Sequence, residues 1–368
     1  MQFRSLLVGK RLVILIAACL LFLLSLVGGY LYFTVTRMVV DSNPAEQMLS
    51  PVPEFSMFDL QPIPTPEVPT SYNLLLIGYG GGGHEGGELS DSLIVAHLDP
   101  LAKRVALVSV PRDLWITLPT GGSNRENRKI NHAYVLGGST LAKQAVSTVV
   151  GLPIQYFISV SFDGITQAID ELDGVTVDVP VAFDDYFYPV PGKEIETCGK
   201  TPEEVGVILT TLSGFEIDKQ FPCRFEQLHF DAGKQLMDGE TALKFVRSRH
   251  SAQHGGDFAR SQRQQALLLG IRDRLLSLGA LNDAVAFFNQ LSHTIQTDLN
   301  EEAILVLKDS AGNLSDYQYR SIQLTTDNAL TLTTSSDGQS ILVPKEGAGH
   351  WDRIHAYIAG AIENPTQE

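Results

Sequence analysis

The sequence predicts an α/β fold, in which a sheet is sandwiched between helices, preceded by one transmembrane helix. Two observations support this prediction. Short β-rich runs alternate with helical patterns from residue 72 onward, an order typical of a sheet covered by helices. An uncharged apolar run of about 22 residues lies near the N-terminus, and about 20 such residues cross a bilayer as a helix. With 368 residues, 44% of them hydrophobic and 19% charged, the chain can bury a core.

The apolar run lies within residues 12–36, which contain no charged side chain and which we predict to be a transmembrane anchor. Arg4, Lys10 and Arg11 precede it, and only Arg37 follows closely. Because positive charge marks the cytoplasmic side, residues 1–11 are expected in the cytoplasm and the rest of the chain outside it. A cleaved signal peptide is the alternative. The length of the run and the lack of a small-x-small cleavage site favour a retained anchor.

Residues 37–71 are expected to form an extracytoplasmic linker, because seven of the chain's 18 prolines lie there. Proline at this density favours extended, semi-rigid conformations. The net charge is −15 although the first 40 residues carry four basic side chains and no acidic one, so the remainder is strongly acidic. Duplex DNA binding requires a basic surface, and we therefore expect no nucleic-acid partner.

Regular elements are expected throughout the part of the chain beyond the linker. β-rich runs predict strands at 72–77, 92–98, 104–110, 155–160 and 175–179. Helical spacing predicts helices at 139–150 with Ser139 as N-cap, at 162–172, and at 257–278 with Asp257 as cap. We expect a folded domain over residues 72–300. Residues 301–368, with small strands and a last helix near 351–362, complete the domain and end in a tail.

One dense basic patch lies in this acidic region, where residues 244–274 contain seven Lys or Arg residues and two acidic ones. Its candidate residues are Arg247, Arg249, Arg260, Arg263 and Gln264. The first two lie two residues apart and would project from one face of an extended stretch. The last three are spaced i, i+3 and i+4 and would share a helix face. Arginine forks bind phosphate bidentately, so the patch predicts a site for an anion with several oxygens. The alternative is a solvated helix face with surface ion pairs.

A second group of candidate residues lies at the ends of predicted strands: Asp91, Arg112, Asp113, Lys129 and Asn131. Asp91 precedes strand 92–98. Pro111 cannot continue a central strand, so Arg112 and Asp113 are expected at the edge of the sheet, where ligands tend to bind. Because Mg²⁺ is usually held by hard oxygen ligands together with substrate phosphates, Asp91 is a candidate Mg²⁺ ligand. A simple ion pair with arginine is the alternative.

Residues 80–87 form a glycine-rich run that resembles a phosphate-binding loop only in composition. No Gly-Lys-Ser/Thr sequence closes it and no helix pattern follows, so we expect a loop at the rim of a site. The chain also lacks the Gly-x-Ser-x-Gly and His-Glu-x-x-His motifs, which leaves a serine hydrolase or a zinc peptidase without support.

Several short motifs follow one another along the globular part: Ser90 to Ser92, Val110 to Asp113, Lys129 to Tyr134, Ile169 to Val179, Leu236 to Leu243, Val246 to His250 and Asp257 to Gln265. In this order they resemble the motifs of the LytR-CpsA-Psr family of bacterial cell-wall enzymes. Each motif is weak by itself, whereas the ordered set is specific. The resemblance covers roughly residues 72–278, with looser similarity toward residue 362.

The resemblance implies a three-layer α/β/α sandwich with a central mixed sheet and a glycopolymer phosphotransferase anchored in the bacterial cytoplasmic membrane. Such enzymes move a glycan from a polyprenyl-pyrophosphate carrier onto a peptidoglycan hydroxyl through a phosphodiester. By motif, Asp91 would help to hold Mg²⁺ on the pyrophosphate, and Gln264 would form hydrogen bonds within the cluster. The pyrophosphate oxygens would be bound by Arg112, Arg247, Arg249 and Arg260. Further substrate contacts are expected from Arg263, Lys129, Asn131 and Asp113.

The sequence departs from the family pattern after its first strand. Most relatives have an acidic residue there and an arginine before the Ser/Thr-flanked aspartate, whereas this chain has the glycine-rich run. The second carboxylate is then either missing or displaced to Glu85 or Glu88. Two other functions stay open: a polyprenyl-pyrophosphate phosphatase or pyrophosphatase, in which water replaces the acceptor, and a non-catalytic protein that binds the wall lipid. A transcription regulator is disfavoured, because the acidic domain would lie across the membrane from DNA.

Two of the three cysteines, Cys198 and Cys223, lie in a polar insertion between Asp184 and Phe230. Since this insertion is expected on the oxidising side of the membrane, we predict a disulfide between them. Closing this loop would contribute on the order of 3 kcal/mol in the chain-entropy model. Two free thiols are the alternative.

Overall fold

The structure is a computed structural model that describes residues 70–81, 87–121, 124–279 and 295–363, which belong to one structural unit. The predicted anchor (12–36), almost all of the predicted linker and residues 82–86 of the glycine-rich run lie outside the described residues. Among the described helices, none has both the length and the hydrophobicity that a bilayer span requires.

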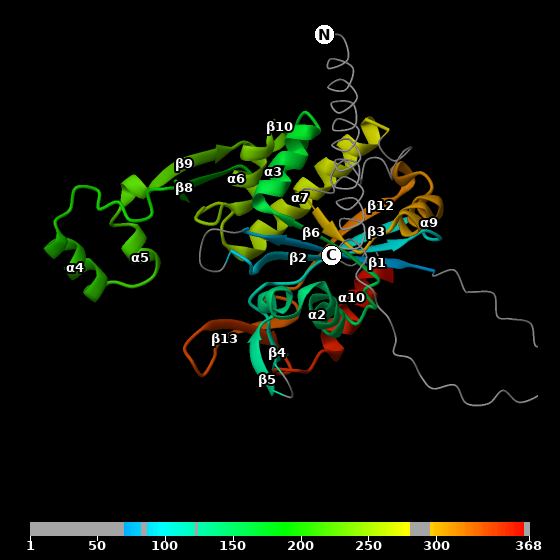
Figure 1. The fold of residues 1–368 in the computed structure, drawn as a ribbon, viewed down its shortest axis with the longest axis horizontal. Helices are drawn as coiled ribbons and strands as arrows, with labels where there is room; N and C mark the ends of the chain where they lie inside the picture. The colour runs from blue at the N-terminus through cyan, green and yellow to red at the C-terminus, as the bar shows by residue number, and fades with distance from the viewer. Residues whose placement is uncertain (1–69, 82–86, 122–123, 280–294, 364–368) are drawn as a thin grey trace, which may run out of the picture. The chain divides into compact units, whose positions relative to one another are not determined.

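A six-stranded mixed sheet forms the centre of the unit (Figure 1). Its strands, in spatial order, are β11 (Ile295–Thr297), β6 (Tyr156–Ser161), β1 (Tyr72–Tyr79), β2 (Ser90–Asp99), β3 (Arg104–Ser109) and β12 (Gln318–Gln323). β1 pairs in parallel with β6 and antiparallel with β2, and β3 pairs antiparallel with β2 and in parallel with β12. The prediction of an α/β fold with a central mixed sheet is confirmed.

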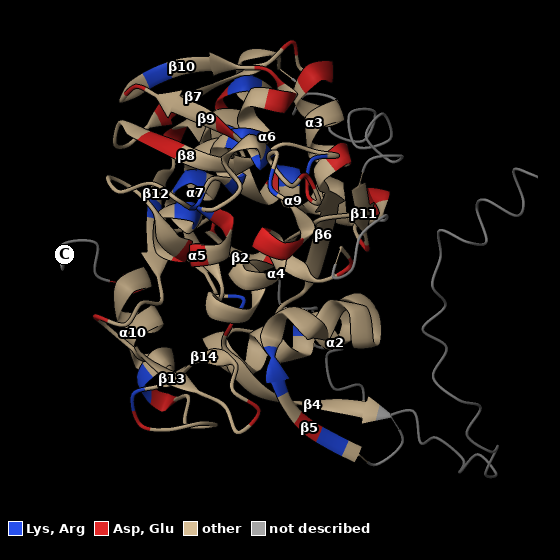
Figure 2. Cartoon of the chain, turned by 90° about the vertical axis from the view of Figure 1, so that its left-hand side faces the viewer, with Lys and Arg blue, Asp and Glu red and all other residues tan. Residues whose placement is uncertain are grey.

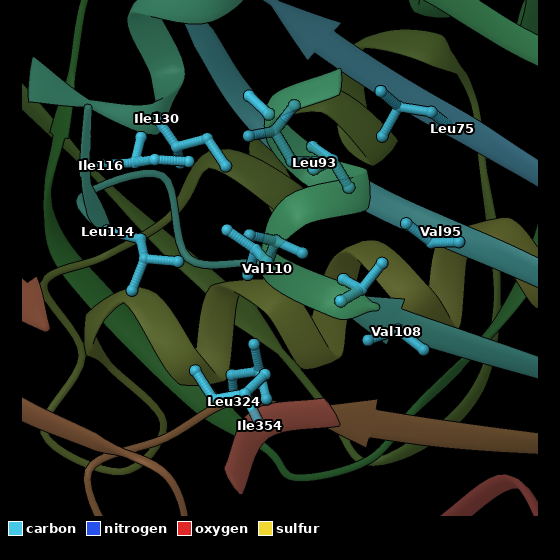
Figure 3. Packing of buried hydrophobic residues seen from close by; sticks show 14 of the residues in the cluster. Leu75, Leu93, Val95, Val108, Val110, Leu114, Ile116, Ile130, Leu324 and Ile354 are labelled. Carbon is cyan, nitrogen blue, oxygen red and sulfur yellow. The ribbon is translucent and has the colours of Figure 1, made fainter. Parts of the chain in front are cut away.

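Four helices pack on the two faces of this sheet: α2 (Ala133–Val150), α7 (Gly256–Ser277), α9 (Glu301–Ala311) and α10 (Asp352–Glu363). Side chains of β1 alternate between the faces. Leu75 and Ile77 belong to the main core with α2 and α10, part of which is shown in Figure 3. Leu76 packs in a cluster with Leu268 of α7, and Leu74 packs in a cluster with α9. Because both faces are covered, the middle of β1, from Leu74 to Ile77, is continuously apolar.

A second core lies next to the sheet. It contains the strand pairs β7 (Val175–Val179) with β10 (Gly233–Met237) and β8 (Phe183–Pro189) with β9 (Phe225–Phe230), and the helices α3 (Phe162–Glu171) and α6 (Gly239–Arg247). Phe183, Phe245 and Leu267 are buried in it. Leu267 and Leu268 are neighbours on α7, yet they belong to different cores. α7 therefore joins the sheet to the second core.

The β8–β9 pair carries α4 (Pro202–Thr211) and α5 (Phe215–Asp218) at its end remote from the central sheet (Figure 1). The structure joins Cys198 to Cys223 by a disulfide across 25 residues of chain, with their Cα atoms 5.6 Å apart. Two further hairpins are formed by β4 (Trp115–Gly121) with β5 (Asn124–Lys129) and by β13 (Leu330–Thr334) with β14 (Ser340–Pro344).

Most sequence-predicted elements begin and end within two residues of the observed ones, but two predicted caps are wrong. α2 consists of two helical stretches that meet at Gly137 and Gly138, whose backbone angles are not helical. The predicted helix 139–150 is the second stretch, and the residue that precedes it is Gly138 rather than Ser139. The two glycines interrupt the helical geometry and therefore read in the sequence as its start. The N-cap of α7 is Gly255, and Asp257 lies in the first turn instead.

Candidate active site

Asp91 and Arg112 meet at one edge of the central sheet. β2 and β3 are antiparallel, so the start of β2, where Asp91 lies, is next to the end of β3, which Arg112 follows. Arg112 Nη1 donates a hydrogen bond of 2.5 Å to Asp91 Oδ1. Arg112 Nε lies 3.7 Å from Asp113 Oδ2, and Asp113 Oδ1 lies 2.7 Å from Lys129 Nζ. Charges of alternating sign thus extend from β2 to the β4–β5 hairpin.

Two more arginines reach Asp91 from the second core and from α7. Arg260 Nη2 donates to the Asp91 carbonyl oxygen at 3.3 Å and lies 3.0 Å from Asp257 Oδ1. Arg249 Nη2 lies 4.0 Å from Asp91 Oδ1 and 3.4 Å from Asp257 Oδ1. Asp91 is therefore the point at which Arg112, Arg249 and Arg260 converge. Figure 2 shows basic segments on α6 and α7, the two helices next to this point.

A cleft of about 260 Å³ opens at this cluster. Its charged and polar lining comprises Asp91, Asp185, Arg247, Arg249, His250, Arg260 and Gln264, and its apolar and aromatic lining comprises Phe162, Phe187, Tyr188, Pro189 and Val246. A smaller cavity on the other side of Asp91 is lined by Arg112, Asp113, Arg260 and Gln264, among others. The cleft combines positive charge with an apolar wall, which suits an anion attached to an apolar chain.

Arg247 enters the cleft in a way that the sequence did not predict. The expected extended stretch is wrong, because Arg247 is the last residue of α6 and Arg249 follows the end of that helix. Both side chains nevertheless line the cleft. The Arg247 guanidinium carbon lies 4.5 Å from the centre of the Phe162 ring, a cation–π arrangement that orients it.

Asp185 is a functional candidate that the sequence analysis did not identify. Its Oδ2 accepts hydrogen bonds from Ser248 Oγ at 2.6 Å and from the backbone N–H groups of Arg249 and His250 at 2.9 and 3.1 Å. Burial acts to raise the pKa of Asp185, but these bonds, with another from the Phe187 N–H, hold its pKa below the usual value. Asp185 therefore fixes the segment that carries Arg249. No sequence motif marks this aspartate, since Ser248, Arg249 and His250 lie more than 60 residues away.

Arg263 does not join the arginine cluster, contrary to the shared helix face expected from the sequence. Its side chain is fully buried, with the guanidinium 4.7 Å from the Phe183 ring centre. Nε donates to the Phe245 carbonyl at 2.9 Å, Nη1 donates to the His254 carbonyl at 2.6 Å, and Nη2 donates to the Ser248 carbonyl. Burial lowers the pKa of Arg263 to about 10. These hydrogen-bond partners of Arg263 are thus backbone carbonyls inside the protein. The prediction that Arg263 contacts the substrate is therefore wrong.

Lys129 and Asn131 lie behind the cluster and not among the residues that line the cleft. Lys129 holds Asp113, as described above. Asn131 is buried, and its backbone N–H donates to the Arg112 carbonyl at 3.3 Å. Both residues therefore support the loop of Arg112.

The cluster leaves hydrogen-bond donors unused. In the part of the chain that the structure describes, Arg112 Nε and Arg260 Nε are buried without a hydrogen-bond partner. Burial, and secondly the charge of Arg112, lowers the pKa of Arg249, as expected for cations crowded together in a desolvated place. Unpaired buried donors and mutually repelling cations are both stabilised by a bound anion with several oxygens.

The described residues offer Mg²⁺ only a partial site. Among them, no group of three or more His, Cys, Asp and Glu side chains is arranged to hold a metal ion. Asp91 supplies two carboxylate oxygens, and Arg112 already contacts one of them. Glu85 lies outside the described residues, and Glu88 is exposed in the turn that precedes β2. These residues fit Mg²⁺ in the usual protein arrangement, in which one or two carboxylates and the substrate phosphates share the ion.

The model of the LytR_cpsA_psr family matches residues 30–347 of the chain. The chain belongs to the LytR-CpsA-Psr family. Its similar curated members include the polyisoprenyl-teichoic acid–peptidoglycan teichoic acid transferase TagV of Bacillus subtilis, 27% identical over 79% of this chain and 64% of TagV. The transferase TagU of Enterococcus faecalis is 27% identical over 63% of this chain and 62% of TagU. The chain thus spans somewhat less than two thirds of the length of these relatives.

Solved structures of LytR-CpsA-Psr proteins share the fold. The crystal structure of B. subtilis TagV superposes with a TM-score of 0.54 at 22% identity, covering 79% of this chain and 95% of TagV. A structure of TagT bound to LIIa-WTA superposes with a TM-score of 0.52 at 21% identity, covering 79% of this chain and 89% of TagT. At these identities the superpositions concern the fold, and the chemistry has to be argued from the cleft.

Proposed function

We propose that this LytR-CpsA-Psr protein is a membrane-anchored phosphotransferase that moves a glycopolymer from a polyprenyl-pyrophosphate carrier onto a peptidoglycan hydroxyl. The observation that carries the proposal is the convergence of Arg112, Arg249 and Arg260 on Asp91, which lines a cleft with an apolar wall. A pyrophosphate that links a polyprenol to a glycan matches both halves of this cleft. The names of TagV and TagU, which are teichoic acid transferases, support the same reaction class.

In this reaction the acceptor oxygen attacks the phosphorus that carries the glycan. A new P–O bond forms, the bridging P–O bond breaks, and polyprenyl phosphate leaves with the electron pair of that bond. The proton of the acceptor hydroxyl passes to the leaving phosphate. Negative charge on the transferred phosphoryl group and on the leaving phosphate must be neutralised, which in phosphoryl transfer accounts for most of the catalysis. Arg112, Arg249 and Arg260 would bind these oxygens, and their mutual contacts with Asp91 and Asp257 hold them in place beforehand.

Arg247 and Gln264 take positions that follow from the cleft. Arg247 lies over Phe162, between the arginine cluster and the aromatic wall, where it would bind the phosphate that carries the lipid. Gln264 lines both cavities next to Asp91 and would bind a phosphate oxygen through its amide. Asp91 would hold Mg²⁺ together with the pyrophosphate, and a bound Mg²⁺ would supply additional charge neutralisation.

The test uses the full chain in detergent with Mg²⁺, a lipid-pyrophosphate oligosaccharide and short peptidoglycan strands, with products identified by mass spectrometry. A phosphodiester-linked adduct that disappears with EDTA and in Arg260→Ala supports the transferase. Release of lipid phosphate without an adduct would show that the protein is a hydrolase and not a transferase. Lipid binding without turnover of any of several donor glycans would show that the protein binds the lipid but does not catalyse the transfer.

A further inference from the structure

A second cavity lies away from the arginine cluster. It measures about 430 Å³ and is bounded by the β4–β5 hairpin, by α2 and by the segment that precedes α10. It lies within the volume range of about 300–1,000 Å³ that small-molecule sites occupy. The chain has two tryptophans, Trp115 on β4 and Trp351 just before α10, and both line this cavity. Nothing in the proposed phosphoryl transfer uses either side chain.

The lining combines aromatic and aliphatic side chains with uncharged hydrogen-bonding groups. Thr117, Asn127, Gln144 and Thr148 supply hydroxyls and amides around the two indole rings. Thr117 Oγ1 donates to Asn127 Oδ1 at 2.7 Å, which leaves the Asn127 amide N–H groups available. Among the described residues, no hydrogen bond engages the side-chain amide of Gln144, which is exposed. The cavity therefore offers several free donors and acceptors next to flat apolar surfaces.

The charge of the lining restricts the ligand. Among the described residues that line the cavity there is no Asp or Glu, which disfavours a cation. Arg125 is the one basic residue among them, which disfavours a polyanion such as pyrophosphate. A lipid chain is disfavoured by the ring of amides and hydroxyls, which would lose their hydrogen bonds against it. A sugar satisfies these conditions, because one face of its ring presents C–H groups to an indole while its hydroxyls meet amides.

The cavity is coupled to the arginine cluster through the β4–β5 hairpin. Trp115 is the cross-strand partner of Lys129, whose Nζ lies 2.7 Å from Asp113. Asp113 in turn contacts Arg112. The hairpin thus extends from the cluster to the cavity, so a glycan in the cavity would lie on the element whose Lys129 holds Asp113, the partner of Arg112.

We propose that this cavity is a saccharide-binding subsite, in which a neutral sugar unit stacks on Trp115 and Trp351 and is bound by Asn127 and Gln144. The role of the subsite rests on the proposed function, in which both the donor glycan and the peptidoglycan strand contain sugars. Saccharide binding itself is measurable without turnover.

The test uses tryptophan emission of the full chain in detergent, because both tryptophans lie in the cavity and a ligand there changes the whole signal. Lipid-free peptidoglycan strands form one arm of the titration, and the lipid-pyrophosphate oligosaccharide forms the other. We expect a saturable change of emission with at least one of them. A change with strands in both the wild type and Arg260→Ala identifies the acceptor glycan, whereas a change with the donor that weakens in Arg260→Ala identifies the donor glycan.

Gln144→Ala and Asn127→Ala test the subsite without removing the reporter. Both side chains lie at the surface, and each variant should weaken the saccharide about 5- to 10-fold, the effect of one lost hydrogen bond. Trp351→Phe, which keeps a ring against the core, should weaken it as well. Unchanged emission in both arms, or undiminished affinity in all three variants, overturns the subsite. Farnesyl pyrophosphate binding, measured by calorimetry, should be unchanged in these variants and lost in Arg260→Ala, so failure of the subsite is distinguishable from failure of the arginine site.

Discussion

Arg260 and Arg263 lie three residues apart on α7, yet their guanidinium groups lie in different environments. Arg260 donates to Asp91 and lines both cavities next to it, whereas Arg263 is enclosed in the second core by carbonyl oxygens and the Phe183 ring. Since three residues advance a helix by less than a full turn, the two side chains point in directions that differ by about 60°. Because α7 is packed on two sides, this difference in direction places Arg260 at the cleft and Arg263 in the second core.

Arg112→Ala and Arg260→Ala should each lower turnover about 100-fold or more, while the fold persists. Each removes one cation from the place where phosphate charge develops. Adduct formation measured by mass spectrometry, with circular dichroism for the fold, checks this. Arg353→Ala is the matched control, because Arg353 is an exposed arginine that contacts Glu346 far from the cleft along the chain. Normal turnover in both cluster variants would disprove the proposed site.

Arg263→Ala should act on stability first. Removing this guanidinium leaves the carbonyls of Phe245, Ser248 and His254 without their partner in a buried place, a cost of about 3 kcal/mol or more. Urea unfolding of Arg263→Ala and Arg260→Ala would compare the two. The larger loss of unfolding free energy should belong to Arg263→Ala. Equal stability of Arg263→Ala and the wild type would mean that these bonds contribute little.

Asp185→Asn should lower both stability and turnover, because an amide cannot accept all the N–H and O–H donors that the carboxylate accepts. The pKa of Asp185 is held below its usual value in the folded state. Its contribution to stability is therefore complete above the unfolded pKa of about 4 and is lost as the pH falls through the folded pKa. Unfolding free energies of wild type and Asp185→Asn should thus differ at pH 7 and converge in acid. A difference that grows as the pH falls would contradict the assignment.

The disulfide predicts that the oxidised protein has no reactive thiol at Cys198 or Cys223. Thiol counting under denaturing conditions, in a Cys19→Ser background, checks this directly, and two reactive thiols would refute it. Cys198→Ser with Cys223→Ser should lower stability on the order of 3 kcal/mol in the chain-entropy model. The loss is expected in the α4–α5 insertion, since the bridge closes only this part of the chain.

Mg²⁺ removal should stop turnover, and the sensitivity should depend on Asp91. EDTA is expected to abolish adduct formation by the wild type, and added Mg²⁺ to restore it. Asp91→Asn should require a higher Mg²⁺ concentration for half-maximal rate, because it removes a negatively charged oxygen ligand. Full turnover in EDTA would exclude the metal from the mechanism.

The sequence alone determined the order and type of most elements and the composition of the arginine cluster. β1, β7 and α3 follow from apolar runs and helical spacing, which are local properties of the chain. Ordered motifs were sufficient to indicate the family and to select Asp91, Arg112, Arg249 and Arg260, all of which the structure brings together. The β8–β9 pair, β10 and α9 were not predicted, because short or solvent-facing elements carry little hydrophobic periodicity.

Only the tertiary structure decided what each polar side chain does. The spacing of Arg260, Arg263 and Gln264 indicates one helix face, but the second core covers that helix on the side of Arg263. Asp185 has no local pattern, and its role depends on backbone N–H groups that arrive from a distant segment. Trp115 and Trp351 likewise line one cavity only because α2 contacts both β4 and α10. Hydrophobic periodicity is a property of neighbouring residues in the sequence. The partners of a polar group, in contrast, depend on which distant segments come within hydrogen-bond distance when the chain packs.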